Sequence, residues 1–197
     1  MRAMSTKPLS FALITCLVGM TAGCSDFIRQ DRSSVTLVID ALEGASGAED
    51  EPIFTGTLQS DVVTGGGVFS DPGRVTIRLI MKDPGEVAAA TNAVTITRYL
   101  VTFRRADGRN TPGVDVPFPF DSAMTFTISP GTTNVAGFEL VRHNAKFEQP
   151  LLGLTNSFVT LSTVADVTFL GRDQAGREVS TRGSIGIQFG NFADPED

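Results

Sequence analysis

The sequence predicts an all-β protein, a single antiparallel β-sandwich of about eight or nine strands. Apolar residues recur at every second position through most of the chain, which is typical of strands with one buried face. The segments between these runs are rich in Asp, Pro, Gly and Asn, the residues that favour turns. A helical period is nearly absent, so we expect one β-sandwich domain over residues 35–192.

Three strands are expected in the first part of this domain. Val35, Leu37 and Ile39 form one apolar face, and a weaker strand runs from about Phe54 to Val63. The third strand has the clearest alternation, with apolar residues at Val75, Ile77, Leu79 and Met81.

The long segment Val94–Arg105 is rich in β-branched residues, but its apolar positions change parity between Ile96 and Tyr99. A β-bulge near Arg98, or a strand that is buried on both faces, would explain the change.

The remaining strands lie in the second half of the domain. They are expected around Met124–Ile128, Ala136–Leu140, Val159–Phe169 and Val179–Phe189. The last is convincing because Ile185, Ile187 and Phe189 share one parity. Only Pro84–Ala93 and Lys146–Leu154 could form a turn or two of helix.

Residues 1–23 have the three parts of a secretory signal peptide. Arg2 and Lys7 are basic, an apolar stretch runs from Leu9 to Met20, and small residues follow at positions 21–23. The apolar stretch is shorter than the roughly 20 residues that a membrane-spanning helix needs. We therefore expect this segment to be removed on export.

The string Met20-Thr21-Ala22-Gly23-Cys24 resembles the lipobox of bacterial lipoproteins, where an aliphatic residue and two small residues precede a cysteine. In that family the cysteine becomes the first residue, is thioether-linked to a diacylglycerol and is usually N-acylated, with chains such as palmitate. The resemblance implies lipidation at Cys24, although Thr21 replaces the usual leucine. The alternative is an ordinary signal peptide cut after Gly23, which would leave Cys24 as a free thiol.

Lipidation at Cys24 would hold the chain on a membrane, because two or more acyl chains anchor a protein stably. Residues 24–34 would form a polar tether, and residues 193–197 an acidic tail. In the lipoprotein family an aspartate directly after the cysteine favours the inner membrane, and this chain has Ser25 there. The resemblance therefore implies the outer membrane of a Gram-negative envelope, facing the periplasm, with exposure at the cell surface as the alternative.

The charge of the exported chain excludes several partners. Without Arg2 and Lys7 it has 14 basic and 22 acidic side chains, a net charge of −8. Such a chain would repel a nucleic-acid backbone, and its net charge argues against a polybasic attachment to anionic lipids. Cys24 is its only cysteine, so no internal disulfide can form and stability must come from core burial.

The closing segment VTLSTVADVTFLGRDQAGREVSTRGSIGIQFG, residues 159–190, resembles the final hairpin of immunoglobulin-like or fibronectin type III-like modules. It has a strand, a polar turn at residues 173–176 and a returning strand. It is also similar to the C-terminal halves of uncharacterised lipoproteins from environmental bacteria. The cysteine pair and core tryptophan of antibody domains are absent, so the resemblance implies the architecture alone.

The sequence contains no motif of a known catalytic site. A nucleophilic triad needs a histidine or an equivalent base, and the only histidine, His143, stands at a strand end with no motif around it. We expect it to be exposed or to cap an edge. The run Gly65–Gly67 lacks a following helix, so it predicts a turn and no phosphate site. No catalytic residue, cofactor or metal ligand is assigned.

The phenylalanines are expected mainly in the core. Phe118 and Phe120 are exceptions because prolines flank Phe118, and they would pack under a loop or form a partner-binding edge. Calcium is the one metal worth considering, since aspartates in loops suit a hard cation. The candidates, all in expected turns, are Asp71, Asp83, Asp107, Asp115, Asp121 and Asp173.

These observations predict a non-enzymatic, lipid-anchored envelope protein that acts as a structural or protein-interaction module, with an envelope protein as partner. Strand addition at an exposed sheet edge is one way it could bind. The alternatives are a calcium- or glycan-dependent surface binder and a hydrolase that uses carboxylates alone. The oligomeric state is left open.

Overall fold

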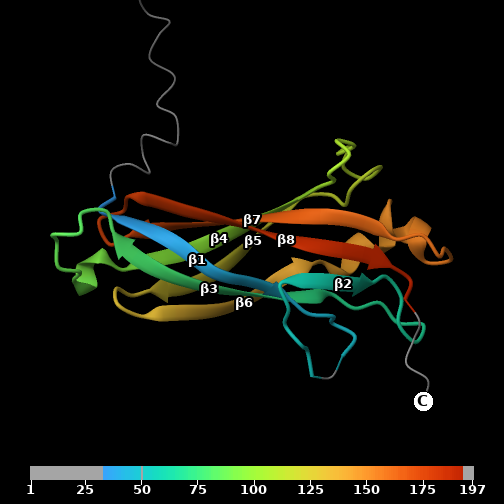
Figure 1. Ribbon diagram of the computed structural model, residues 1–197, viewed down its shortest axis with the longest axis horizontal. Coiled ribbons are helices and arrows are strands. Elements are labelled where there is room, and N and C mark those ends of the chain that lie inside the picture. The colour runs from blue at the N-terminus through green and yellow to red at the C-terminus, as the bar shows by residue number, and fades with distance from the viewer. Residues whose placement is uncertain (1–32, 50, 193–197) are drawn as a thin grey trace, which may run out of the picture.

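The computed structural model describes residues 33–49 and 51–192 and has an all-β fold of two sheets (Figure 1). The smaller sheet has the strand order β1-β3-β6, and the larger, which is curled, has the order β2-β8-β7-β4-β5. The eight strands are β1 (Val35–Gly44), β2 (Thr57–Asp61), β3 (Asp71–Met81), β4 (Val94–Arg104), β5 (Phe120–Ile128), β6 (Thr133–Val141), β7 (Leu161–Asp173) and β8 (Glu178–Gly190). The all-β prediction with two sheets is therefore confirmed.

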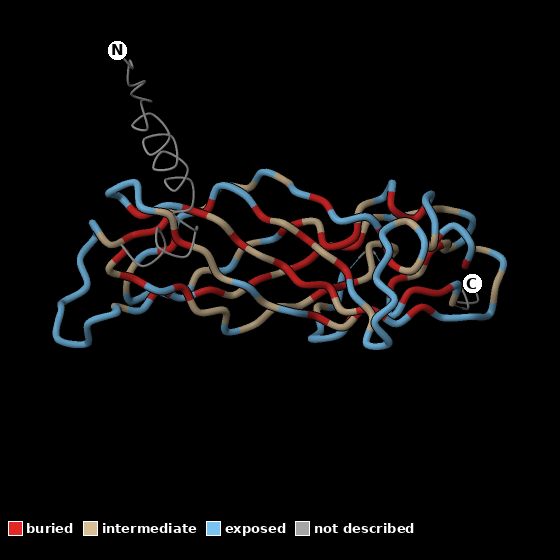
Figure 2. Tube along the Cα trace, turned by 90° about the horizontal axis from the view of Figure 1, so that it is seen from above, coloured by how far each residue is buried: buried red, intermediate tan, exposed pale blue. Residues whose placement is uncertain are grey.

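The core lies between the two sheets, because both contribute the inward-facing half of each alternating strand. Buried residues run through the middle of the molecule, and the exposed segments are mainly loops (Figure 2). Tyr99 of β4 and Phe138 of β6 meet with ring centroids 5.2 Å apart, and Phe169 of β7 packs edge-on against Phe138 at 5.4 Å. These contacts join strands of opposite sheets and account for much of the apolar burial.

Most strand pairs are antiparallel, and one is parallel. β1 pairs with β3, β3 with β6, β4 with both β5 and β7, and β7 with β8. The short strand β2 runs parallel to β8, from Thr57 beside Gly186 to Asp61 beside Gly190. The chain therefore leaves the smaller sheet after β1 and adds β2 to the edge of the larger sheet.

The change of parity in β4 is a β-bulge. Its register with β7 shifts between Ile96 and Arg98, which leaves Thr97 as the extra residue and places Thr97 and Arg98 both on the exposed side. Gly171 of β7 makes the bulge possible, because a Cβ there would lie 2.3 Å from the carbonyl oxygen of Thr95. The expectation of a bulge near Arg98 is confirmed.

Some boundaries differ from those expected. β2 covers only five residues, because the chain on either side of it forms loops. The two stretches expected to contain helix have short 3₁₀ turns, at Ala90–Asn92 and, in the second stretch, at His143–Phe147 and Leu151–Leu154. The structure thus retains the helical turns but makes them tighter and shorter than an α-helix.

The phenylalanines are less buried than expected. Phe120 is buried against Tyr99 as the first residue of β5. Phe118 is partly exposed but packs on its loop, since a Cβ at Gly113 would lie 2.3 Å from its ring. The core assignment is wrong for Phe69, Phe147 and Phe158, which are exposed because they lie in loops and turns outside the alternating strands.

Candidate functional site

The residue predicted to carry the lipid, Cys24, lies outside the described residues, as do the leader, most of the tether and the acidic tail. Its lipidation stays a prediction. His143 is exposed at the end of β6, where its ring packs against Phe147 with centroids 5.0 Å apart. Gly65 and Gly66 have positive φ in a tight turn closed by Thr64 and Gly67, as expected.

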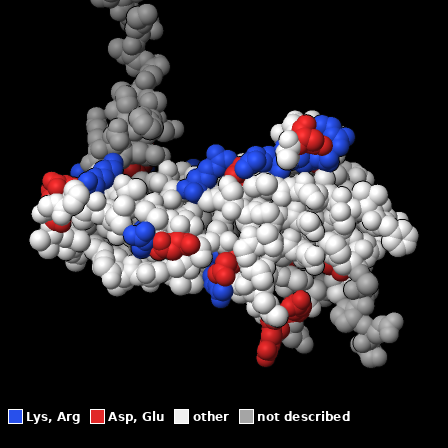
Figure 3. Space-filling model, in the orientation of Figure 1, with Lys and Arg blue, Asp and Glu red and all other residues white. Residues whose placement is uncertain are grey.

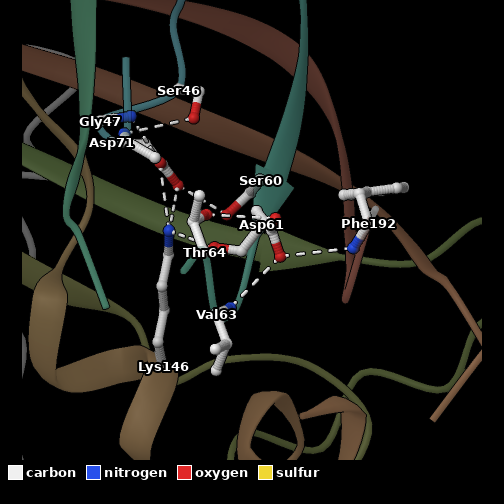
Figure 4. Close-up of polar contacts among 10 residues, drawn as sticks. Ser46, Gly47, Ser60, Asp61, Val63, Thr64, Asp71, Lys146 and Phe192 are labelled. Atoms are coloured by element: carbon white, nitrogen blue, oxygen red, sulfur yellow. Dashed lines mark hydrogen bonds and ion pairs between the residues drawn. The ribbon is translucent and has the colours of Figure 1, made fainter. Parts of the chain in front are cut away.

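The most buried polar cluster in the described part of the chain joins Asp71 and Lys146 (Figure 4). Both side chains are 1% exposed, and the Lys146 ammonium lies 3.0 Å from Asp71 Oδ2 and 3.1 Å from Oδ1. The ammonium also donates to the backbone carbonyl of Asp61 at 2.7 Å. The start of β3, the end of β2 and the 3₁₀ turn after β6 are thereby tied together.

The Asp71 carboxylate receives further hydrogen bonds. Ser60 Oγ donates to Oδ2 at 2.6 Å, and the backbone N–H of Gly47 donates to Oδ1 at 3.1 Å. Burial raises the pKa of Asp71 above its usual value, and the Lys146 charge opposes this effect. Because every oxygen has a donor and no side of the pair is exposed, the arrangement suits a structural tie and leaves no group to act on a substrate.

Asp61, next to this cluster, has its side chain turned toward the loop after β2 (Figure 4). Its Oδ1 accepts hydrogen bonds from the backbone N–H of Val63 at 3.2 Å and of Phe192 at 3.3 Å. Its Oδ2 accepts one from Thr64 Oγ1 at 3.1 Å. Asp61 therefore fixes the turn after β2 and holds the chain end that follows β8.

A second cluster lies on the outer face of the larger sheet, around Asp166 of β7. Arg104 from β4 and Arg182 from β8 approach its Oδ2 at 2.8 and 2.6 Å, and Ser184 donates to Oδ1. Burial raises the pKa of Asp166, but the hydrogen bonds from Ser184, Arg104 and Arg182 outweigh it and lower the pKa below its usual value. This carboxylate therefore stays ionised and holds two arginines side by side.

The aspartates considered for calcium are not brought together. No group of three or more His, Cys, Asp or Glu within residues 33–49 and 51–192 is arranged to hold a metal ion. Asp107, for example, is bound by Arg105 and Arg109, and its hydrogen bond with Arg105 lowers its pKa to about 2. Asp121 pairs with Arg98, and Asp173 with Ser33 and Arg177. These carboxylates serve turns and ion pairs.

The sequence did not predict the Asp71–Lys146 pair or the Asp166 cluster. Asp71 and Lys146 are 75 residues apart, and neither stands in a motif. The alternation in β7 places Asp166 on the outer face, but its burial follows from Arg104 and Arg182, which come from two other strands. A local pattern contains no information about such neighbours.

Comparisons with protein-family models, with curated proteins and with solved structures find no match. Across the residues that the structure describes, no helix is long and apolar enough to cross a membrane. The fold and its polar clusters define the class, an all-β protein of two sheets whose buried charges are paired within the chain.

Proposed function

We propose that this chain is a non-enzymatic, lipid-anchored protein of the bacterial envelope, which binds a partner protein through the free edge of β5. The lipid would be attached at Cys24, and the resemblance to lipoproteins places the domain at the outer membrane, facing the periplasm. The single observation that carries the binding role is that β5, among the described residues, pairs on one side only and contains neither a lysine nor a proline.

The strand order supports a finer assignment of the fold. If β1, β3 and β6 correspond to strands A, B and E of an immunoglobulin-like sandwich, the other sheet reads G, F, C and C′ for β8, β7, β4 and β5. This is the order of immunoglobulin-like domains, with β2 added beside strand G. Because one fold can host many unrelated functions, the proposed role rests on the edge strand described next.

The edge of β5 is open to strand addition. β5 pairs with β4 alone, and among the described residues no loop or turn forms a backbone hydrogen bond with it. Natural edge strands are usually protected by lysines, prolines or bulges. After Asp121, the strand continues as Ser122–Ile128 without a charge or a proline, and its register with β4 shifts once, between Ala123 and Phe126. An extended partner segment could therefore complete its hydrogen bonds.

The other sheet edge nearby, β6, is partly closed. The Tyr99 hydroxyl reaches across from β4, donates to the backbone carbonyl of Glu139 at 3.1 Å and accepts from its N–H at 3.2 Å. Glu139 lies opposite Pro72, which has no N–H to offer. Because these backbone groups are satisfied within the chain, β5 is the better edge for a partner.

The anchoring is tested by fractionation of cells that express the exported protein. Wild-type protein is expected in the membrane fraction, and the Cys24→Ala variant in the soluble fraction, because only the acyl chains hold it. Mass spectrometry of the exported chain should find an acylated Cys24. An unmodified thiol, or wild-type protein that is wholly soluble, would refute the anchor.

The binding edge is tested by cross-linking in intact envelopes. We expect a discrete cross-linked species that disappears in the Ala123→Lys/Thr125→Lys variant, because both positions are exposed on β5 and lysine disfavours strand pairing at an edge. The control is Ser162→Lys, an exposed position on the central strand β7. Equal loss in both variants, or no loss in either, would contradict binding at β5.

A further inference from the structure

A hollow of about 510 Å³ that two arginines line lies on the outer face of the larger sheet, over β4, β7 and β8. Its rim carries two arginines, Arg98 and Arg172, and three hydroxyl side chains, Thr97, Thr168 and Ser180. Glu178 is the single acidic side chain that lines it, 3.4 Å from Arg172. Arg98 is also paired, with Asp121 at 3.1 Å, so each arginine has one carboxylate partner and keeps more than half of its side chain exposed.

The bulge in β4 builds this hollow. Because Thr97 is the extra residue, it and Arg98 follow one another on the exposed side of the strand. Gly171 lies opposite the bulge, where a Cβ would meet the backbone of β4 at Thr95. The same local feature therefore opens the hollow and supplies one of its two cations.

The outer face is more basic than the composition suggests, because most of its arginines extend above their carboxylates; Arg98 and Asp121, at 55% and 50% exposed, are the exception. Arg104 and Arg182 are 50% and 60% exposed, while the Asp166 beneath them is 4% exposed. At the hollow, Arg172 is 64% and Glu178 39% exposed. Basic side chains line the upper edge in Figure 3, over β7 and β8 and on the loop between β4 and β5. The net charge averages over both faces and conceals this separation.

The hollow lies at the end of the sheet where the described chain begins. Ser33 Oγ donates a hydrogen bond at 2.9 Å to Asp173, the residue directly after Arg172. Cys24 precedes Ser33 by nine residues. A fully extended chain spans at most about 3.3–3.6 Å per residue, so a lipid on Cys24 would be roughly 30 Å away or closer.

We propose that this hollow binds the phosphate group of an anionic phospholipid in the membrane that carries the anchor, so that the outer face of the larger sheet lies against the bilayer. The inference rests on the proposed lipid at Cys24. Guanidinium groups bind phosphate with two parallel hydrogen bonds, and the hydroxyls of Thr97 and Thr168 offer further donors. The second cation and the nearby tether make a bilayer surface a better occupant than a free ion.

The test uses the exported chain with Cys24→Ala, which has no lipid, and vesicles of phosphatidylcholine with or without phosphatidylglycerol. We expect co-sedimentation only with the phosphatidylglycerol vesicles, and its loss in 0.5 M NaCl, since salt screens exposed charges. The added changes Arg98→Gln/Arg172→Gln should weaken binding about tenfold or more, given the usual contribution of an arginine near an anionic surface.

The matched control is Arg74→Gln/Arg78→Gln. These two arginines lie on β3 of the other sheet, are also half exposed, and are also paired with carboxylates, Glu43 and Asp40. The control removes the same charge, so equal loss in both double variants would overturn the proposal. Complete competition by millimolar inorganic phosphate would show a free-anion site and would also overturn it.

Circular dichroism would show whether a variant folds poorly. In that case the salt and lipid dependence of binding by the Cys24→Ala chain still tests the hollow. If the Cys24→Ala chain does not bind phosphatidylglycerol vesicles, the inference about the hollow is overturned. The proposed anchor is unaffected by that result if the wild-type protein is found acylated at Cys24. If the Cys24→Ala chain binds these vesicles but Cys24 is unmodified in cells, the proposed anchor is refuted. The proposal that the outer face lies against the membrane that carries the anchor is then refuted as well.

Discussion

Asp71 and Asp166 are both buried carboxylates with cationic partners. They differ in whether the cationic side chain is buried or reaches the surface. Lys146 is as buried as Asp71, whereas Arg104 and Arg182 reach the surface above Asp166. Burial raises the pKa of Asp71, while the donors around Asp166 outweigh burial and lower its pKa. The first cluster therefore connects segments inside the fold, and the second supports an exposed cationic surface.

The largest effect is expected from Lys146→Met, which leaves Asp71 buried with only Ser60 and Gly47 as donors. Removing one partner of a buried ion pair typically costs about 3–5 kcal/mol. Denaturant unfolding should show this loss in the free energy of unfolding. The double variant Asp71→Leu/Lys146→Met should recover much of it, because no charge then stays buried, and a double variant no better than the single one would contradict this account.

A smaller effect is expected from Arg104→Gln and Arg182→Gln. Each arginine is half exposed or more, so solvent screening limits either single loss to about 1 kcal/mol or less. Together they leave Asp166 with Ser184 alone, so the combined loss should exceed the sum of the two single losses. A double-mutant cycle measures the difference, and strict additivity would show that the arginines act independently.

The two carboxylates should also differ in their effect on stability as pH changes. The lowered pKa of Asp166 means that its contribution is present above the usual value of 3.8 and lost as pH falls through its native pKa. Asp71, whose pKa is raised, has the opposite pH dependence. Its contribution to stability is present below 3.8 and is lost as pH rises through its native pKa. Unfolding curves between pH 2 and 7 should therefore show that Asp166→Asn loses less stability at acid pH than the wild-type protein does. The same loss at acid pH in both proteins would contradict the lowered pKa of Asp166.

The smallest effect is expected at an ion pair exposed on both sides. Arg74 and Glu43 lie 3.0 Å apart on β3 and β1, and both are partly exposed. Arg74→Gln should cost about 0.2–1 kcal/mol and less at high salt. A loss as large as that of Lys146→Met would show that burial is not what separates the clusters.

Much of the fold could be predicted from the sequence, and the polar clusters could not. Alternation located the strands of the second half and the bulge near Arg98, because the direction of each side chain follows from its place along the strand. The same reasoning misplaced Phe147 and Phe158, which stand outside the alternating runs. Charge counting predicted an acidic surface and missed the arginines gathered above Asp166.

The sequence by itself determined the strand class, the turns and an expected export signal with Cys24 at its end, because each depends on residues that are neighbours in the chain. Only the tertiary structure decided that Asp71 meets Lys146, that Ser33 meets Asp173 and that β5, among the described residues, pairs with β4 alone. Those contacts join residues as much as 140 positions apart, so they depend on which strands pair and which sheet each strand enters. Local periodicity does not specify strand order, and the candidate binding surfaces follow from that order.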